Sequence, residues 1–178
     1  MSNIVVMHRK YADERALDDV INYCYRKADY WFGAGVRCEN IETAKESMRY
    51  IKKYYRQEDG RQLVHFVINV NSIFGTGEAY SRRIWSIDYR RMDSFAYAVS
   101  LLLFGKGYQN CFFYHSNRET PHVHFVLNSV SCKDGRKLRE PKELGFEIIR
   151  FLKKNYSDCR WIGVYDNNVK TDKYGYQS

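Results

Sequence analysis

The spacing of apolar residues along the chain predicts four helices. In three of them the apolar positions recur in steps of three and four, which places them on one face of an α-helix. Asp13 is the expected N-cap of the first helix, which ends before a turn at Trp31–Gly35. The other predicted helices are Ile41–Tyr55 with Asn40 as its N-cap, the apolar segment Met92–Phe104, and Pro141–Asn155 with proline at its first position.

Short apolar runs between these helices predict five strands. The predicted strands are Asn3–His8, Leu63–Val70, Cys111–His115, His122–Val130 and Trp161–Tyr165. The segment Asn71–Tyr80 is rich in Gly, Ser and Asn, so we expect a loop there. We expect the polar residues Asp166–Ser178 to form a loose tail.

One predicted strand pair carries most of the histidines. Three of the five, His115, His122 and His124, fall within ten positions. Alternate side chains of a strand point to one face, so His122 and His124 should emerge together, with Cα atoms about 6–7 Å apart. His115 ends the neighbouring strand and can add a third nitrogen across the turn. A lone strand histidine is more often a satisfied core residue, but this pattern predicts a metal site with positions open for water or a phosphate oxygen.

Composition adds a preference for polyanionic partners. The chain has 29 basic and 21 acidic residues, a net charge of +8, and 16 tyrosines. Single-stranded nucleic acid suits this mixture, because bases stack on rings while Lys and Arg contact phosphates, although most of the rings are expected to pack or cover surface. Rings and arginines interleave between Tyr80 and Arg91. The DNA-binding candidates in that segment are Arg82, Arg83, Trp85, Arg90 and Arg91.

Length and cysteine content bound the class of protein. A chain of 178 residues suits one domain. Its five cysteines are widely spaced and form no CxxC pair, which fits free thiols in a reducing cytoplasm. No apolar run approaches the roughly 18 residues of a membrane span, and the N-terminus lacks the apolar region of a signal peptide. We therefore expect a cytoplasmic protein with no membrane segment.

The histidine segment resembles the His-hydrophobic-His motif of the HUH endonucleases, and within them the MobP-type relaxase and mobilisation nucleases. The matching residues are His115, His122–Val130, Asp134–Lys137, and the turns Gly35–Cys38 and Asp59–Gln62. Two positions depart from the family: Asn117 stands where it has Asp, and Asn69-Val70 where it has Ser-Phe. The resemblance spans about Leu17 to Arg139. It implies an α+β HUH endonuclease/relaxase fold, in which helices flank a central antiparallel sheet carrying the histidines, with a catalytic domain over residues 1–165 and a tail over 166–178.

The resemblance also implies an enzyme that nicks and rejoins one DNA strand at an origin of transfer for conjugative mobilisation. Tyr23 is the implied nucleophile, which would form a 5′-phosphotyrosine link. Periodicity alone does not choose between Tyr23 and Tyr25, because they flank the apolar stripe on opposite sides. The implied ligands of Mg²⁺ or Mn²⁺ are His115, His122 and His124, and the residues expected to support them are Asn117, Asn128 and His65. Implied partners are single-stranded DNA and accessory relaxosome and coupling proteins.

Two other functions fit the same histidine motif. HUH replication initiators and single-tyrosine transposases place their tyrosine after the histidines, where Tyr156 lies beside Lys153 and Lys154. A catalytically impaired relative that only binds single-stranded DNA would fit the departures at Asn117 and Asn69. A comparison of tyrosine variants in a nicking assay separates these alternatives.

Overall fold

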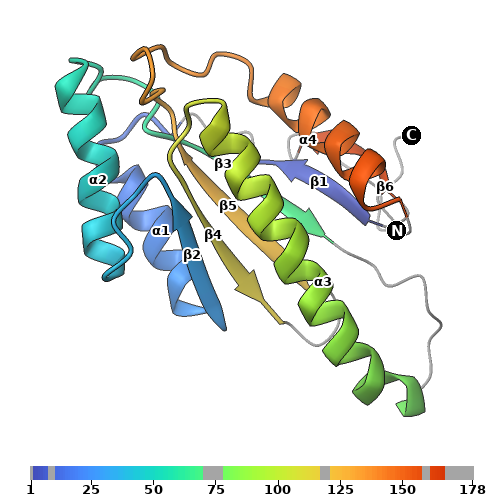
Figure 1. Cartoon of the computed structure of the whole chain (residues 1–178). Helices are drawn as coiled ribbons and strands as arrows, with labels where there is room; N and C mark the ends of the chain where they lie inside the picture. Colours follow the sequence, from blue (N-terminus) through green and yellow to red (C-terminus); the bar gives the residue numbers. More distant parts are fainter. Residues whose placement is uncertain (1, 8–10, 70–77, 117–120, 158–160, 167–178) are drawn as a thin grey trace.

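The described part of the chain, in a computed structural model, forms one sheet of six strands with two helices packed on each face (Figure 1). The structure describes residues 2–7, 11–69, 78–116, 121–157 and 161–166, with the backbone alone at 78–91 and 166. The strands are β1 (Ser2–Val6), β2 (Tyr30–Ala34), β3 (Leu63–Asn69), β4 (Asn110–His115), β5 (His122–Asn128) and β6 (Trp161–Asp166). The helices are α1 (Ala16–Arg26), α2 (Ile41–Tyr54), α3 (Glu78–Gly105) and α4 (Pro141–Asn155). None of the described helices is both long and apolar enough to span a bilayer.

The sheet is antiparallel over most of its width. Its strand order is β2-β4-β5-β3-β1-β6, and every neighbouring pair is antiparallel except β1 and β6, which run parallel. The histidine strands β4 and β5 therefore lie inside the sheet, between β2 and β3. The predicted α+β fold with a central antiparallel sheet is confirmed, with one parallel pair added at its edge.

Alternating side chains of the strands build two separate hydrophobic cores. On β4 and β5, Phe112 and Phe125 face α3 and α4, whereas their chain neighbours Phe113 and Val126 face α1 and α2. We call these the α3/α4 core and the α1/α2 core. The helices contribute Phe95, Val99, Ile148 and Leu152 to the α3/α4 core, and Leu17, Ile21 and Met48 to the α1/α2 core. His115 and His124 alternate in step with Phe113 and Val126, so they lie on the α1/α2 face.

Local sequence signals account for the ends of two helices. Asn40 caps α2: its side chain accepts a hydrogen bond from the Thr43 N–H at 3.0 Å, and the Thr43 hydroxyl accepts one from the Asn40 N–H at 3.3 Å. This reciprocal capping satisfies backbone donors that have no partner within the helix. The helix α4 begins at Pro141, whose missing N–H costs nothing at that position. Both predictions are confirmed.

Several other boundaries were wrong. The predicted turn at Trp31–Gly35 is the edge strand β2, and the chain turns only at Gly35, whose φ of 73° is open to glycine at little cost. The N-cap of α1 is Arg15, and Asp13 instead accepts a hydrogen bond from the Arg15 N–H at 2.8 Å. β1 ends at Val6, before the predicted His8, and α3 begins at Glu78, far before the predicted Met92. Residues 78–80 of the predicted loop belong to α3, and Asp166, the first residue of the predicted tail, ends β6. The rest of that loop and tail lies outside the described residues.

Candidate active site

β4 and β5 bring three histidines together on the sheet face that α1 covers. His115 and His122 lie directly opposite one another in the antiparallel register, and His124 follows two residues along β5. The ring centroids are separated by 5.1 Å for His115 and His122, 4.6 Å for His115 and His124, and 5.0 Å for His122 and His124. One nitrogen of each ring lies within 4.8 Å of the others, so small side-chain adjustments would let all three contact one cation. The predicted histidine cluster is therefore present in the fold.

Backbone contact with α1 sets the protonation pattern of His115. Its Nε2 lies 2.8 Å from the carbonyl oxygen of Cys24, near the end of α1. A carbonyl only accepts, so Nε2 carries the hydrogen and donates it. In the neutral ring the lone pair is then on Nδ1, which is the nitrogen able to bind a cation.

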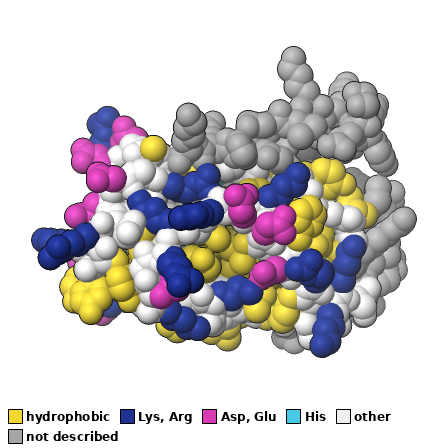
Figure 2. All heavy atoms as spheres, turned by 90° about the horizontal axis from the view of Figure 1, so that it is seen from above, with side chains coloured by type: hydrophobic (Ala, Val, Ile, Leu, Met, Phe, Trp, Pro, Cys, Tyr) yellow, Lys and Arg dark blue, Asp and Glu magenta, His cyan; other side chains and the backbone are white. Residues whose placement is uncertain are grey.

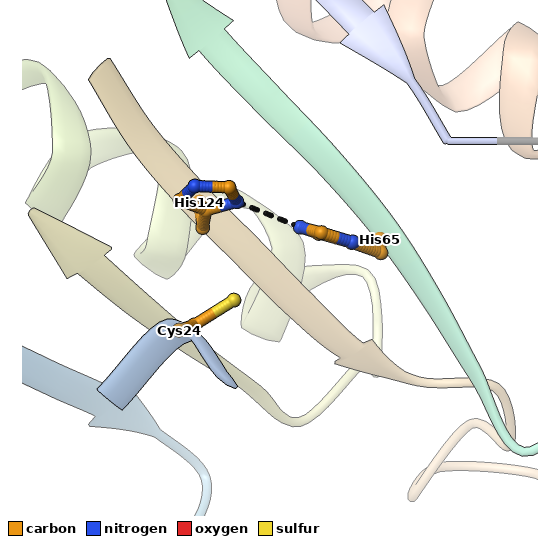
Figure 3. A group of neighbouring side chains, drawn as sticks. All are labelled: Cys24, His65 and His124. Carbon is orange, nitrogen blue, oxygen red and sulfur yellow. Dashed lines mark hydrogen bonds between the residues drawn. The ribbon is translucent and has the colours of Figure 1, made fainter. Parts of the chain in front are cut away.

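A hydrogen bond with His65 holds the ring of His124 (Figure 3). Its Nδ1 lies 2.8 Å from Nε2 of His65 on β3, and Nδ1 of His65 lies 3.3 Å from the Tyr11 hydroxyl. If His124 donates to His65, and His65 donates onward to Tyr11, the lone pair of His124 falls on Nε2. That direction leaves Nε2 for an ion shared with His115 and His122, which is the arrangement usual for a ligating histidine.

Burial keeps two of these rings in their neutral form. Burial, reinforced by repulsion from the neighbouring histidines, lowers the pKa of His124 from its ordinary 6.5 to about 2. Burial also lowers the pKa of His115, partly offset by its hydrogen bond to Cys24. Both rings are therefore neutral near pH 7, and each has one nitrogen with a lone pair, as ligation of a cation requires.

Tyr23 is the tyrosine that lies beside the histidines. It projects from α1 with 47% of its surface exposed, and its ring centroid lies 6.3 Å from that of His124 in an edge-on contact. Tyr25 is similarly exposed at 43%, but its ring packs against Trp31 on β2. The structure thus separates two residues that helical periodicity had left equivalent.

Two charged residues next to the site, Lys27 and Asp29, were not predicted from the sequence. The Lys27 ammonium lies 5.0 Å from the centroid of the Tyr23 ring, and its position four residues later on the chain was the available signal. The Asp29 carboxylate accepts a hydrogen bond from the Ser116 N–H at 2.7 Å, which ties the end of β4 to the segment before β2. No local signal pointed to Asp29, because this contact depends on strand pairing.

Among the remaining supporting and DNA-binding candidates, the structure describes one side chain, that of Asn128. Asn128 lies at the far end of β5, where its amide donates to the Met48 carbonyl and to the Gln109 side chain, both at 2.9 Å. It therefore braces the sheet against α2 and does not contact a histidine of the cluster. Asn117 is outside the described residues. The side chains of Arg82, Arg83, Trp85, Arg90 and Arg91 are also outside them, and the structure places only their backbone, in the first half of α3.

Tyr156 lies across the sheet from the histidine cluster. It follows α4, its hydroxyl pairs with Ser94 of α3 at 3.1 Å, and its ring packs edge-on against Phe95 in the α3/α4 core. The intervening sheet separates this hydroxyl from the nitrogens of the cluster.

Comparison with known families agrees with this geometry. A family model described as relaxase, MobA/VirD2-like, nuclease domain matches residues 23–156, a span that begins at Tyr23 and includes all three clustered histidines. The chain belongs to this relaxase family. The relaxase nuclease domain thus carries its clustered histidines and Tyr23 on one side of the central sheet. No solved structure matches the chain significantly.

A curated relative covers the relaxase domain and extends beyond it. The chain is similar to "Protein rlx" of Staphylococcus aureus, with 24% identity over 155 residues. The aligned part is 87% of this chain and 43% of the relative, so the chain spans less than half of that protein's length.

Proposed function

We propose that this relaxase domain nicks and rejoins single-stranded DNA at an origin of transfer by transesterification through Tyr23, assisted by a divalent ion. The observation that carries the proposal is the edge-on contact of Tyr23 with His124, one of the three clustered histidines. It places a half-exposed candidate nucleophile directly beside a candidate cation site whose rings His115 and His124 are buried.

The donor set fits a divalent ion. His115, His122 and His124 would hold it, and the contacts of Cys24 and His65 orient two of the three rings. Three imidazoles leave coordination positions for oxygen ligands and favour Mn²⁺ over Mg²⁺ in affinity, although the more abundant Mg²⁺ can serve in a cell. When bound, the ion supplies positive charge to the scissile phosphate.

The chain's own residues would carry the covalent step. The Tyr23 oxygen attacks phosphorus and the bond to the 3′ oxygen breaks, which leaves a 5′-phosphotyrosine and a 3′-hydroxyl on the released strand. The phenol loses one proton and the departing 3′ oxygen gains one. Lys27, against the Tyr23 ring, places positive charge beside the phenolate that attacks. Attack by the 3′-hydroxyl reverses the step and reseals the strand, because the phosphotyrosine conserves the phosphodiester energy.

Denaturing electrophoresis for a covalent protein–DNA adduct tests this proposal. Labelled single-stranded oligonucleotides tiling the candidate origin would be incubated with Mn²⁺ and the wild type, Tyr23→Phe or Tyr25→Phe. We expect an adduct with the wild type and Tyr25→Phe, and none with Tyr23→Phe, whose fold and strand binding should persist. An adduct that persists in Tyr23→Phe and disappears in Tyr25→Phe would assign the nucleophile to Tyr25.

The same assay addresses the rival functions. Loss of the adduct only in Tyr156→Phe would favour a replication initiator or a transposase, although the position of Tyr156 against Phe95 and Ser94 gives that assignment no support. Strand binding without any adduct across Mg²⁺, Mn²⁺, Co²⁺ and Zn²⁺ would favour a binding protein that does not cut. Mass spectrometry of the digested adduct identifies the attached tyrosine directly.

The DNA path and the cellular context belong to the proposal as well. Seen from above, the molecule presents basic side chains mixed with acidic ones, and no histidine of the described residues is visible on that face (Figure 2). We assign strand contacts to the first half of α3, because rings and arginines interleave along that segment of the sequence. The catalytic domain would comprise residues 1–165 with a tail over 166–178, act in the cytoplasm, and work with accessory relaxosome and coupling proteins.

A further inference from the structure

A second group of ligand-forming side chains adjoins the clustered histidines and shares His124 with them. Cys24 of α1, His65 of β3 and His124 of β5 each offer one ligand atom, and these atoms lie within 4.8 Å of one another. All three residues are buried, with exposed fractions of 0%, 4% and 7%. In Figure 3 the Cys24 sulfur points toward the gap spanned by the hydrogen bond between His65 and His124.

The order of the elements explains why these three residues meet. β3 and β5 are neighbours in the sheet, and Val67 pairs with His124, so His65 lies one diagonal step along the same face. α1 crosses this face with Cys24 turned inward, while the adjacent Tyr23 turns outward. No short sequence motif unites positions 24, 65 and 124.

We propose that Cys24, His65 and His124 form a second metal site, which binds a thiophilic divalent ion such as Zn²⁺. One thiolate and two imidazoles suit Zn²⁺, with bonds of about 2.3 Å to sulfur and about 2.0–2.1 Å to nitrogen, and water can complete a tetrahedron. Two nitrogens on such an ion are roughly 3.3 Å apart. The present separation of 2.8 Å between His65 Nε2 and His124 Nδ1 therefore needs to widen only slightly.

Binding exchanges protons and bonds in a defined way. The Cys24 S–H bond breaks, a metal–sulfur bond forms, and the proton leaves to solvent. The hydrogen bond between His65 and His124 is replaced by two metal–nitrogen bonds. His65 keeps its hydrogen on Nδ1 toward Tyr11, and the hydrogen of His124 moves from Nδ1 to Nε2, which frees Nδ1 for the ion. No oxidant or reductant is involved.

Sharing of His124 makes the two sites mutually exclusive. A neutral imidazole has one nitrogen with an available lone pair. When Nδ1 of His124 binds the inner ion, Nε2 carries the hydrogen and is lost to the outer set with His115 and His122. A thiophilic ion would therefore disable nicking by withdrawing one ligand. Inner-site binding stands on its own geometry, whereas this inhibitory consequence rests on the proposed function.

Cobalt absorption spectroscopy tests the inner site without DNA. Co²⁺ occupies zinc sites and, when bound to thiolate, gives a near-ultraviolet charge-transfer band that imidazoles do not produce. The full chain would be titrated with Co²⁺ as wild type, as His115→Ala/His122→Ala, and as Cys24→Ser. We expect the band at one equivalent in the wild type and in the double variant, which keeps the inner site alone, and its loss in Cys24→Ser.

Matched cysteine variants keep the result interpretable. Cys132→Ser should retain the band, and Cys24→Ala offers a second replacement if the serine is poorly accommodated in the core. Absence of the band in folded wild type, or its persistence in Cys24→Ser, overturns the proposal. Zn²⁺ should displace the band from the wild type, from His115→Ala/His122→Ala and from Cys132→Ser.

A competition titration tests exclusivity. Excess Mn²⁺ should diminish the cobalt band in the wild type by drawing His124 to the outer set, and should leave it unchanged in His115→Ala/His122→Ala. Equal insensitivity of both proteins would overturn the exclusivity. Failure of adduct formation on DNA would reject the proposed function and leave the cobalt result intact, so the two proposals fail separately.

Discussion

The hydrogen bond between His65 and His124 makes a sharp prediction about ion affinity. Replacing His65 by leucine leaves an apolar side chain of similar size and removes the nitrogen that receives the His124 N–H when His124 is the donor of this hydrogen bond. His124 is only 7% exposed, so water cannot readily take over as the acceptor. Its ring must then keep an unpaired N–H, rotate, or move its hydrogen to Nε2, and the last change removes the lone pair from the outer ion site.

The expected loss of Mn²⁺ affinity in His65→Leu follows from two independent estimates. A buried donor left unpaired costs about 1–3 kcal/mol. Removing the hydrogen-bond partner of a ligating histidine typically costs about 10–100-fold in metal affinity, which is about 1.4–2.7 kcal/mol. The two ranges overlap, so we expect the Mn²⁺ dissociation constant of His65→Leu to rise about 10–100-fold.

Calorimetric titration with Mn²⁺ measures this effect, and His65→Gln provides the control. A glutamine oxygen can accept from Nδ1 of His124 near the position of the lost imidazole nitrogen, so this variant should recover much of the affinity. Circular dichroism establishes that each variant is folded. Wild-type affinity in His65→Leu, or an equal loss in the leucine and glutamine variants, would refute the reasoning.

Three further predictions concern stability and strand binding. Burial lowers the pKa of Lys52 to about 8 from 10.5, so between these values the unfolded chain holds more protons, and stability should rise with pH by up to about 3 kcal/mol. Urea unfolding of Lys52→Met should show a flatter pH dependence over that window, and an unchanged slope would exclude Lys52 as its source. Asn128→Ala should lower the free energy of unfolding by about 2–4 kcal/mol, because its side chain makes three buried hydrogen bonds, to Met48, Gln109 and Val130. The Mn²⁺ affinity should stay unchanged, and an equal loss of ion binding would contradict the bracing role. Single-stranded DNA should bind more tightly than duplex, with a log–log salt slope of about 0.7 per phosphate contact, and a flat slope would argue against electrostatic binding.

Local patterns were sufficient where local interactions decide the structure. The cap at Asn40 and the start at Pro141 depend on residues a few positions apart, and both helices begin as predicted. Edge strand β2 was missed because Trp31 and Phe32 precede glycines and follow a helix closely, which favours a turn locally. Pairing with β4 overrides that preference, since each β2 residue gains a partner between Asn110 and Tyr114.

In the candidate site, too, the sequence predicts the features that depend on local spacing and misses those that depend on tertiary contacts. The spacing of His122 and His124 and their proximity to His115 could be predicted, because one hairpin contains all three. The choice of Tyr23 over Tyr25 depends on where α1 crosses the sheet. The contact of His65 with His124 joins residues 59 positions apart, and Cys24 reaches the same place from a third element. These contacts form only when the sheet is assembled, so no local sequence pattern indicates them.

The division of the hydrophobic interior into two cores has a consequence for how this protein can change over time. Replacements among Phe112, Phe125 and their partners on α3 and α4 change thermal stability from the side of the sheet opposite the clustered histidines. Replacements near Cys24 or Phe113 alter stability and chemistry together, because those side chains adjoin the histidines. Substitutions that arise in evolution, or in directed selection for stability, should therefore be tolerated more readily in the α3/α4 core than in the α1/α2 core.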